Sequence, residues 1–458
     1  MSYYETMEKS TFRILLSLPF YMPVNPGIIS SNPYTYIPST IAEYVYRFIG
    51  SKSNFNLGKP HLDLFCSLPE DTLSRLKLSK KLFRRDIPYK MHYESRRLDN
   101  IMKSILSVNI PVYLQKFEFI IHENMNKDLD QFLQNDYVFI ENIFDYLQQI
   151  LANIAIRQCY GEAAKNDQGI LNAVMSIAGK KISYTEKYLS TLSKFRFFNR
   201  KSNAVRAREY LMEFVTKGKF QELNKGSWDL DQTVVNLVQK NQEELNIPDD
   251  IFFTIIPDYV SLFVTVFGEK LPNFLIDISL NPRIHKILKD EQKKIMAKHG
   301  KGITEKQINE MIYLDAALTE SLRLDVINLS MREALCDFFL PNGVCIPKGA
   351  VVKFSNITHN RSRQIFKRHP HDHIPERQIE LGTKLEVTSK TNLAWGFGRK
   401  CPYRKYCATF LKLFAATLLR TYDVSQGEWS KNITHDGYVF EYGASHAKKS
   451  LYLSRREI

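Results

Sequence analysis

The feature of this chain that most constrains its fold is a long, mostly apolar segment from Asp249 to Leu280. It carries few charges and is longer than a typical helix, so we expect a helix that runs through the interior of a large domain. Pro257 and Pro272 interrupt the segment, and each removes a backbone hydrogen bond and favours a kink. A chain of 458 residues is long enough to bury such a helix.

Most of the other segments also show helical spacing of apolar residues. Between Asp71 and about Lys219 the pattern is mostly helical, as in Phe139–Ile156, where one face is apolar. A capping box at Thr304–Gln307 opens a helix that we expect to end near Leu324. We also expect a loop and a short helix within 220–248, and a final helix at Arg404–Thr421.

A smaller part of the chain has β character. Phe338–Leu340 and Val344–Ile346 flank Pro341-Asn342-Gly343, which is a hairpin turn signal, and Val351–Phe354 continues the strand pattern. The sequence therefore predicts a mainly α fold with a minor β region, in a single large domain covering residues 1–458. Two ranges are expected to be irregular, 1–60 (with short strands) and the polar segment 355–392.

The charge balance narrows the class of partner. The chain has 63 basic and 49 acidic residues, a net charge of +14, which favours an acidic protein or an anionic surface. The Lys and Arg residues are spread along the chain without a zinc-finger or basic-zipper pattern, so we do not expect nucleic acid as a partner. The four histidines between His359 and His373 fit no common zinc spacing.

Cysteine usage and hydropathy bear on location. The six cysteines are scattered, form no CxxC pair and follow no signal peptide, which favours a reducing compartment. The most apolar N-terminal stretch, Ile14 to Val24, holds two prolines and is shorter than the ~20 residues of a membrane span. We therefore expect no transmembrane segment in this chain.

Cys401 is the candidate metal ligand. It follows a loop with Gly396 and Gly398 and precedes the final helix, and Arg399 and Lys400 supply the positive charge that favours a thiolate. A cysteine in this setting is a plausible axial ligand of haem iron. A buried free cysteine before a helix is the alternative interpretation.

Three charged residues upstream form a second pattern. Glu320 and Arg323 are spaced i, i+3, so they share one face of a helix, and Arg377 follows Pro375-Glu376. An isolated pair of this kind on a surface helix contributes little and implies no function. The order of the three elements, with the cysteine loop last, makes a functional interpretation stronger.

Together these residues resemble the cytochrome P-450 family. In that family the Glu and Arg of an ExxR helix pair with a downstream Arg, and the three residues brace the haem-binding loop. The resemblance gives these roles to Glu320, Arg323 and Arg377. The similarity covers about residues 250–420 and is closest to filamentous-fungal members over Leu318–Pro347.

The resemblance also implies a cofactor and its contacts. Cys401 would be the axial ligand of the iron of haem b, and Arg332 and Arg399 would hold the haem propionates. The acid–threonine pair of the family falls near Thr265-Val266, so Thr265 is the candidate catalytic hydroxyl.

The chain departs from the family pattern in the cysteine loop and near Thr265. One residue is missing between Gly398 and Arg399, and Tyr403 replaces the glycine that follows the family's cysteine. Val266 and Phe267 cannot relay protons beside Thr265. These departures put haem affinity and oxygen activation in doubt.

The function that the resemblance implies is haem-dependent monooxygenation. Such an enzyme would hydroxylate or epoxidise a small apolar organic substrate with dioxygen, in secondary or lipid metabolism. Electrons would come from an NADPH-dependent reductase that docks on the basic face near Lys400, Arg404 and Lys405. We expect either a peripheral position on the endoplasmic reticulum membrane or a cytoplasmic location.

Two alternatives remain open. One is a haem-thiolate enzyme that does not use dioxygen, either peroxide-dependent or isomerising, which the poor proton relay near Thr265 suggests. The other is a degenerate, non-catalytic member, which the shortened loop and Tyr403 suggest.

Overall fold

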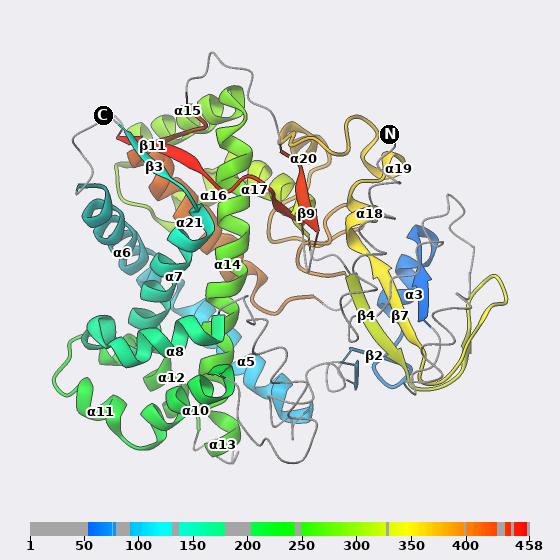
Figure 1. Ribbon diagram of the computed structural model, residues 1–458, viewed down its shortest axis with the longest axis horizontal. Coiled ribbons are helices and arrows are strands. Elements are labelled where there is room, and N and C mark those ends of the chain that lie inside the picture. Colours follow the sequence, from blue (N-terminus) through cyan, green and yellow to red (C-terminus); the bar gives the residue numbers. More distant parts are fainter. Residues whose placement is uncertain are drawn as a thin grey trace. The chain divides into compact units, whose positions relative to one another are not determined.

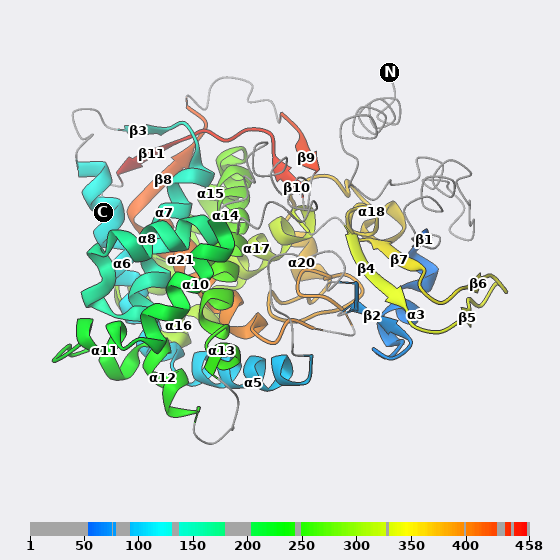
Figure 2. The same cartoon turned by 60° about the horizontal axis from the view of Figure 1, so that its bottom comes forward.

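The structure, a computed structural model, groups the chain into two compact units, and we describe each by itself (Figures 1 and 2). The sheet unit combines Met1–Arg84 with Ile327–Ile365, and the helical unit combines Arg85–Val326 with Phe366–Ile458. The structure describes residues 54–75, 77–78, 92–130, 137–178, 203–242, 249–326, 329–397, 400–427, 436–440 and 444–455. The stretch Ile14 to Val24 lies outside these ranges.

The sheet unit is built on a four-stranded sheet of order β1-β7-β4-β2, in which β1 runs parallel to β7 and the other pairs are antiparallel (Figure 1). A helix packs on it through Phe65, whose ring stacks on Phe354 at 5.9 Å between centroids. The elements within this unit are β1 (Asn54–Leu57), η2 (Lys59–His61), α3 (Leu62–Ser67), β2 (Leu73–Ser74), β4 (Leu329–Ala334), β5 (Phe338–Phe339), β6 (Cys345–Ile346), β7 (Val351–Ser355) and α18 (Asn356–Asn360). The short helix α19 (Arg363–Phe366) spans the junction between the residue ranges of the two units.

The helical unit contains the long helices and two small sheets. Its first part comprises α5 (His92–Val108), α6 (Ile110–Asp130), β3 (Tyr137–Ile140), α7 (Ile143–Tyr160), η3 (Glu162–Asn166), α8 (Gln168–Ala178), α10 (Asn203–Thr216), α11 (Lys219–Leu223), η4 (Leu230–Gln232), α12 (Val234–Lys240), α13 (Asp249–Phe252), α14 (Ile255–Ser279), α15 (Pro282–His299), α16 (Glu305–Glu310) and α17 (Ile312–Leu324). Its second part comprises α20 (Glu376–Glu380), α21 (Arg404–Thr421), β8 (Tyr422–Ser425), β9 (Tyr438–Phe440), β10 (Ala444–His446) and β11 (Leu451–Arg455).

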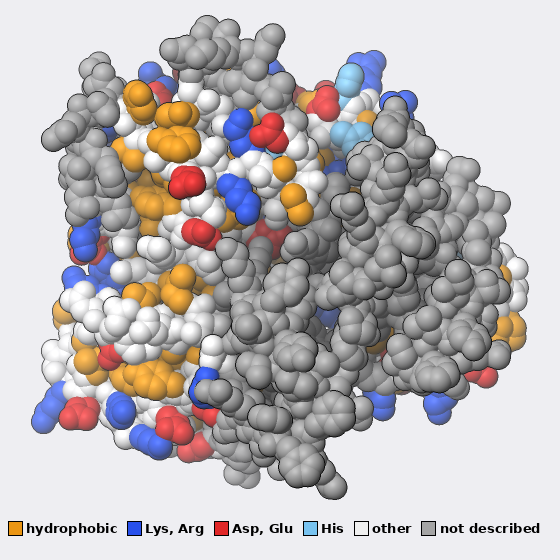
Figure 3. Space-filling model, viewed as in Figure 1, with side chains coloured by type: hydrophobic (Ala, Val, Ile, Leu, Met, Phe, Trp, Pro, Cys, Tyr) orange, Lys and Arg blue, Asp and Glu red, His pale blue; other side chains and the backbone are white. Residues whose placement is uncertain are grey.

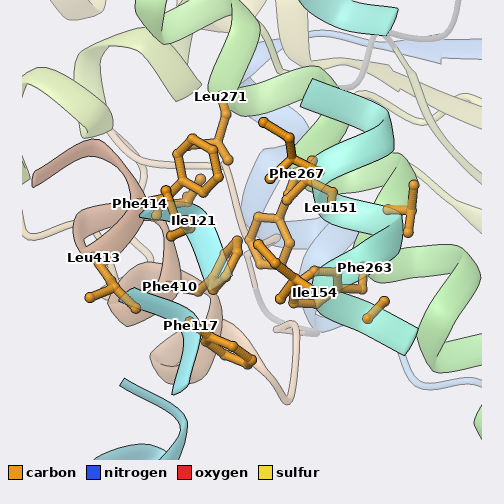
Figure 4. Close-up of a cluster of buried hydrophobic side chains, with 14 of the residues drawn as sticks. Phe117, Ile121, Leu151, Ile154, Phe263, Phe267, Leu271, Phe410, Leu413 and Phe414 are labelled. Atoms are coloured by element: carbon orange, nitrogen blue, oxygen red, sulfur yellow. The ribbon is translucent and has the colours of Figure 1, made fainter. Parts of the chain in front are cut away.

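The core of the helical unit is aromatic where α14 packs on α21 (Figure 4). Phe410 of α21 contacts Phe263 and Phe267 of α14, with ring centroids 4.8 Å and 4.4 Å apart, and Phe117 of α6 meets Phe410 edge-on at 5.3 Å. All four rings are buried. Offset and edge-on aromatic pairs of this kind stabilise a core beyond the area that they bury.

Side-chain caps define where several helices begin. The Asn142 side chain accepts the amide protons of Phe144 and Asp145 at the start of α7. Asn281 caps α15 in the same way, with Pro282 at the first helical position, where a missing amide costs no helical hydrogen bond.

Several predicted elements are confirmed. Helix α21 has the predicted bounds Arg404–Thr421, and β5 and β6 form the predicted hairpin, with Gly343 at φ 83° in its turn. Thr304 caps α16 by accepting from the amide of Gln307, although the Gln307 side chain donates to the carbonyl of Gly300 instead of closing the box. The fold class, mainly α with a small sheet component, is confirmed.

Two predictions about helices are wrong. The helix after Thr304 is not continuous, because it breaks at Met311 into α16 and α17. Glu291 of α15 explains the break, since its carboxylate accepts the first free amide protons of α17, from Tyr313 at 2.6 Å and Leu314 at 3.0 Å. The interruption at Pro272 is also wrong, because α14 continues through that residue.

Two ranges contain more regular structure than predicted. The polar segment 355–392 holds three short helices, α18, α19 and α20, in place of an extended loop. Between 220 and 248 the described residues form the end of α11, the short turn η4 and α12, which is more than the single helix predicted.

One face of the surface carries mixed charges, and the hydropathy of the described helices bears on whether they could cross a membrane. On the face shown in Figure 3, around α8, α10 and α11, basic and acidic side chains are interspersed. Within the described ranges, none of the helices combines the length and the apolar character that a membrane crossing requires.

Candidate functional site

The three predicted bracing residues meet in a buried ion cluster of the helical unit. Arg323 donates from Nε and Nη2 to the two carboxylate oxygens of Glu320 at 2.9 Å and 2.7 Å, the contact expected of an i, i+3 pair on α17. Arg377 of α20 donates from Nη1 to Glu320 Oε1 at 2.9 Å. Gln378 completes the set from Nε2 at 2.6 Å, so the carboxylate, which is fully buried, is bound from two elements.

The cluster also fixes the chain that precedes α20. Arg377 Nη2 donates to the carbonyls of Arg368 and His369 at 2.8 Å, and Arg323 Nη1 donates to the carbonyl of Pro370 at 2.7 Å. His369 and Lys367 have φ of 45° and 43°, a region that residues other than glycine rarely adopt. The arginine hydrogen bonds therefore hold a strained loop in place.

The charges of the cluster determine whether the Glu320 carboxyl group is protonated. Burial alone would raise the pKa of Glu320, but the hydrogen bond and charge of Arg323, followed by the charge of Arg377, bring it below its ordinary value. The carboxylate is therefore ionised, and the cluster is a buried salt bridge rather than a neutral hydrogen-bonded group.

The loop before Cys401 is anchored through Trp395. The buried indole donates from Nε1 to the carbonyl of Leu385 at 2.6 Å, and the amide of Cys401 donates to the carbonyl of Trp395 at 2.8 Å. Gly396 between them has φ 83°, which explains why glycine occupies this position. Gly398 and the predicted propionate partner Arg399 lie outside the described residues.

Cys401 is half-buried, and its pKa lies below the ordinary value of a thiol. The neighbouring thiol of Cys407 is the largest cause, and with the Tyr403 amide and the Arg404 charge it outweighs the effect of burial. The Cys401 thiol in turn raises the pKa of Cys407. Donors directed at a sulfur favour its thiolate form, which is the form that binds metals.

Tyr403, the residue that departs from the family pattern, is fixed by a residue far away in sequence. Its hydroxyl donates to Asp99 Oδ1 of α5 at 2.5 Å. Burial and the carboxylate of Asp99 both raise the pKa of Tyr403, so the phenol keeps its proton as the donor. The bond ties the segment between Cys401 and α21 to α5.

Thr265 lies on α14, and its hydroxyl is 3.4 Å from the carbonyl of Ala178 at the end of α8. Val266 is half-buried, and Phe267 is buried against Phe410. One turn before Val266, Leu262 is 55% exposed.

Arg332 belongs to the sheet unit, where its guanidinium contacts Phe65. It donates from Nη1 to the carbonyl of Phe65 and lies 4.2 Å from the centre of the Phe65 ring. These contacts place the Arg332 side chain against α3 and leave its predicted contact with a haem propionate a proposal.

Sequence reasoning missed Asp99, Cys407, and a buried group formed by Tyr259, Gln158 and Tyr406. Tyr259 donates to Gln158 Oε1 at 2.7 Å, and its hydroxyl lies 2.9 Å from that of Tyr406, so the group joins α14, α7 and α21. Cys407 could have been found from the sequence, since it lies in the first turn of the predicted final helix, close to Cys401. Nothing in the sequence indicates the role of Asp99, because its partner Tyr403 is about 300 residues away in the chain.

The histidines of the segment 355–392 have structural contacts. His373 Nε2 lies 3.0 Å from the carbonyl of Ala317, and His369 Nδ1 lies 3.5 Å from a carboxylate oxygen of Asp372. Across the described ranges no group of three or more His, Cys, Asp or Glu side chains is arranged to hold a metal ion.

The environment of Cys401 fits haem iron on chemical grounds. A cysteine sulfur with a lowered pKa, directed donors and partial exposure is the ligand that haem-thiolate proteins use. The Cys407 thiol and the Tyr403 amide would orient that ligand.

Comparison with known proteins also finds similarity to a family of haem proteins. Residues 270–444 match the sequence model of the family cytochrome P-450. The chain is 27% identical over 198 residues to (+)-menthofuran synthase of Mentha piperita, covering 43% of this chain and 40% of the relative. It is 25% identical over 290 residues to ferruginol synthase of Isodon rubescens, covering 61% and 58%.

A fungal relative is also similar. Cytochrome P-450 monooxygenase ATR3 of Stachybotrys chlorohalonatus is 21% identical over 295 residues, covering 54% of this chain and 61% of that protein. In all three relatives the match spans less than two thirds of the relative's length. The matched region contains Glu320, Arg323 and Cys401. From residue 270 to 444 the chain is thus similar to cytochrome P-450 proteins, a family whose cofactor is haem and whose mainly α fold it has.

Proposed function

We propose that the protein is a haem-thiolate monooxygenase, with Cys401 as the axial ligand of haem b iron. The observation that carries the proposal is the buried cluster in which Arg323 and Arg377 bind the Glu320 carboxylate, followed along the chain by the half-buried Cys401. When bound, the haem would supply dioxygen activation, and the enzyme would hydroxylate or epoxidise a small apolar organic molecule.

The bracing and anchoring roles follow from the contacts described above. Glu320, Arg323 and Arg377 would hold the segment between α17 and the cysteine loop rigid, because a buried, fully bonded ion cluster has few alternative arrangements. Arg399 and Arg332 would bind the propionates.

The partners are proposed on charge and similarity. Lys400 is exposed and Lys405 is largely exposed, which supports docking of an acidic, NADPH-dependent reductase near the Cys401 loop. The names of the plant relatives, menthofuran synthase and ferruginol synthase, support a role in secondary metabolism. The fungal relative supports the fungal-type assignment. We propose a location at the cytoplasmic side of the endoplasmic reticulum membrane or in the cytoplasm.

A haem-thiolate enzyme that does not use dioxygen is the second candidate. The Thr265 hydroxyl is directed to the carbonyl of Ala178, and neither Val266 nor Phe267 has a titratable proton. This favours a peroxide-dependent or isomerising reaction over one that needs protons delivered along α14. Product formation with reductase and NADPH, compared with peroxide alone, separates the two candidates.

The experiment that tests the haem-thiolate site is a difference spectrum of dithionite-reduced protein with and without carbon monoxide. The thiolate-specific Soret band should form in the parent protein and be lost in Cys401→Ala, while Cys336→Ala, which changes an exposed cysteine of the sheet unit, should retain it. Soluble, folded parent protein that takes up no haem from supplied haemin would favour the degenerate, non-catalytic member instead.

A further inference from the structure

A hydrogen bond between Tyr403 and Asp99 connects the segment that follows Cys401 to a helix distant in sequence. The Tyr403 hydroxyl donates to Asp99 Oδ1 at 2.5 Å, and Tyr403 is the residue immediately before α21. Asp99 lies on α5, whose neighbouring side chains Leu98 and Met102 are buried in the core of the helical unit. The acceptor of the bond therefore lies on a helix that core packing holds in place.

The chain between Cys401 and Tyr403 has little conformational freedom. Pro402 separates the two residues, and its ring fixes its own φ at about −65°. A proline also restricts the residue before it, so the backbone of Cys401 favours extended conformations. Because these dihedral angles are restricted, a displacement of Tyr403 is passed on to Cys401 rather than absorbed between the two residues.

Other hydrogen bonds hold the main chain of the same segment. The amide of Cys401 donates to the carbonyl of Trp395 at 2.8 Å, and Arg404 Nη1 donates to the carbonyl of Cys401 at 3.3 Å. The carbonyl of Tyr403 accepts from the amide of Cys407 at 2.9 Å as α21 begins. These bonds join the segment to its own loop and to α21, whereas the Tyr403–Asp99 bond joins it to a third element.

We propose that Asp99 is a positioning residue for Cys401, acting through the Tyr403 hydroxyl. It sets where the segment from Cys401 to Tyr403 lies against α5, and thereby how the Cys401 sulfur is presented. The part of this role that concerns haem iron rests on the function proposed above, because a metal ligand must be oriented by the groups around it. The glycine of the family pattern, which has no side chain, could not make this contact.

A charge effect of Asp99 is the competing explanation. The Asp99 carboxylate raises the pKa of Cys401 as well as accepting from Tyr403, so removing it changes both the bond and the local charge. Tyr403→Phe separates the two effects, since it removes the hydroxyl and leaves the carboxylate. Positioning therefore predicts that Tyr403→Phe and Asp99→Ala act alike, whereas a charge effect predicts that only Asp99→Ala acts.

The first experiment measures the alkylation rate of Cys401 by iodoacetamide in the full-length, haem-free protein. Trypsin cleaves after residues 400 and 404, so the peptide 401–404 reports on this cysteine alone. The parent sulfur is half-buried, and a loosened segment should expose it. We expect several-fold faster alkylation in Tyr403→Phe and in Asp99→Ala, and no further increase in the double variant.

The matched control for the lost carboxylate is Asp231→Asn. Asp231 is exposed and paired with Lys240, and its replacement should leave the alkylation rate of Cys401 at the parent value. Faster alkylation in Asp99→Ala alone, with Tyr403→Phe at the parent rate, would overturn the proposal in favour of charge. Parent rates in both variants, or additive effects in the double variant, would also overturn it.

The second experiment measures iron ligation in the reduced protein with carbon monoxide. We expect Tyr403→Phe and Asp99→Ala to lower the fraction of bound haem that shows the thiolate-specific Soret band, and Asp231→Asn to retain the parent fraction. An unchanged fraction beside faster alkylation would reject the role toward iron and leave the positioning of Cys401 established. A parent protein that takes up no haem would reject the proposed function, and the alkylation rates would still decide whether Asp99 positions Cys401.

Discussion

Arg377 Nη1 lies 2.9 Å from Glu320 Oε1, which joins α20 to α17 across 57 residues of chain. Because the carboxylate is fully buried, the ion pair is screened little by salt and its removal cannot be compensated by water. This contact connects the predicted ExxR motif to the strained loop before α20.

Glu320→Gln should therefore destabilise the helical unit strongly. The change leaves two buried guanidinium groups without their carboxylate, and breaking one partner of a buried pair costs about 3–5 kcal/mol. The free energy of unfolding from denaturant titration measures the effect. Glu213→Gln, which removes an exposed ion pair with Lys217, is the matched control and should change stability by less than about 0.5 kcal/mol. Equal effects of the two substitutions would contradict the bracing role.

Phe410→Ala should be among the most destabilising core substitutions. Its ring contacts Phe117, Phe263 and Phe267 at once, and removing it leaves a cavity between α14 and α21 with an expected cost of about 3–5 kcal/mol. Thermal or chemical unfolding measures the change. Ile312→Ala removes an apolar side chain that is 59% exposed, and it should have a much smaller effect.

Tyr403→Phe should lower stability by about 1 kcal/mol, because it removes a hydrogen bond from a half-buried phenol to the carboxylate of an exposed residue. A double-mutant cycle with Asp99→Asn isolates the contact, since the second substitution should add little once the first is made. Tyr137→Phe, at an exposed tyrosine, serves as the control. Strictly additive effects would show that Tyr403 and Asp99 do not interact.

Replacing Tyr403 by glycine and inserting a residue after Gly398 restores the family pattern. We expect this double change to increase haem content if loop geometry limits haem binding. The ratio of haem absorbance to protein measures the effect. Unchanged haem content in a folded variant would count against the view that the loop is the limiting feature.

Stability should fall as pH rises because of Asp325. Burial raises the pKa of this carboxyl to about 6, although the nearby Lys270 opposes the shift. The folded state then binds a proton more tightly than the unfolded chain, whose carboxyl has a pKa of 3.8, so stability is lost between about pH 4 and pH 6. The size of the effect is on the order of 3 kcal/mol.

Asp325→Asn removes the titrating group and should remove that part of the pH dependence. The free energies of unfolding of both proteins, measured at several pH values between 4 and 7, give the comparison. A parallel pH dependence in the two proteins would show that Asp325 titrates at its ordinary pKa.

The sequence predicted those elements whose determinants are local. The bounds of α21 follow from its apolar spacing, and the β5–β6 hairpin follows from the turn residues that end at Gly343. The Glu320–Arg323 contact follows from i, i+3 geometry. Its bond to Arg377 was expected from the family resemblance, because the spacing of the two residues alone does not bring them together.

The remaining features depend on distant parts of the chain. The break at Met311 has no glycine or proline to signal it, and the cap that stabilises it comes from Glu291 on another helix. The contact between Tyr403 and Asp99 is likewise set by tertiary packing. Such contacts depend on the assembled fold, which residue spacing along one chain does not encode.

The pairing of β3 with β11 has a consequence for synthesis. Tyr137–Ile140 pairs with Leu451–Arg455, residues translated roughly 300 codons later, and β11 in turn pairs with β8. The strand at 137–140 therefore leaves the ribosome long before its partner exists, with its edge open to other chains. In the sheet unit, β1 is likewise translated long before β7, the strand with which it pairs. Completion of either sheet must follow synthesis of distant segments, so chaperone protection during translation should matter for the yield of folded protein.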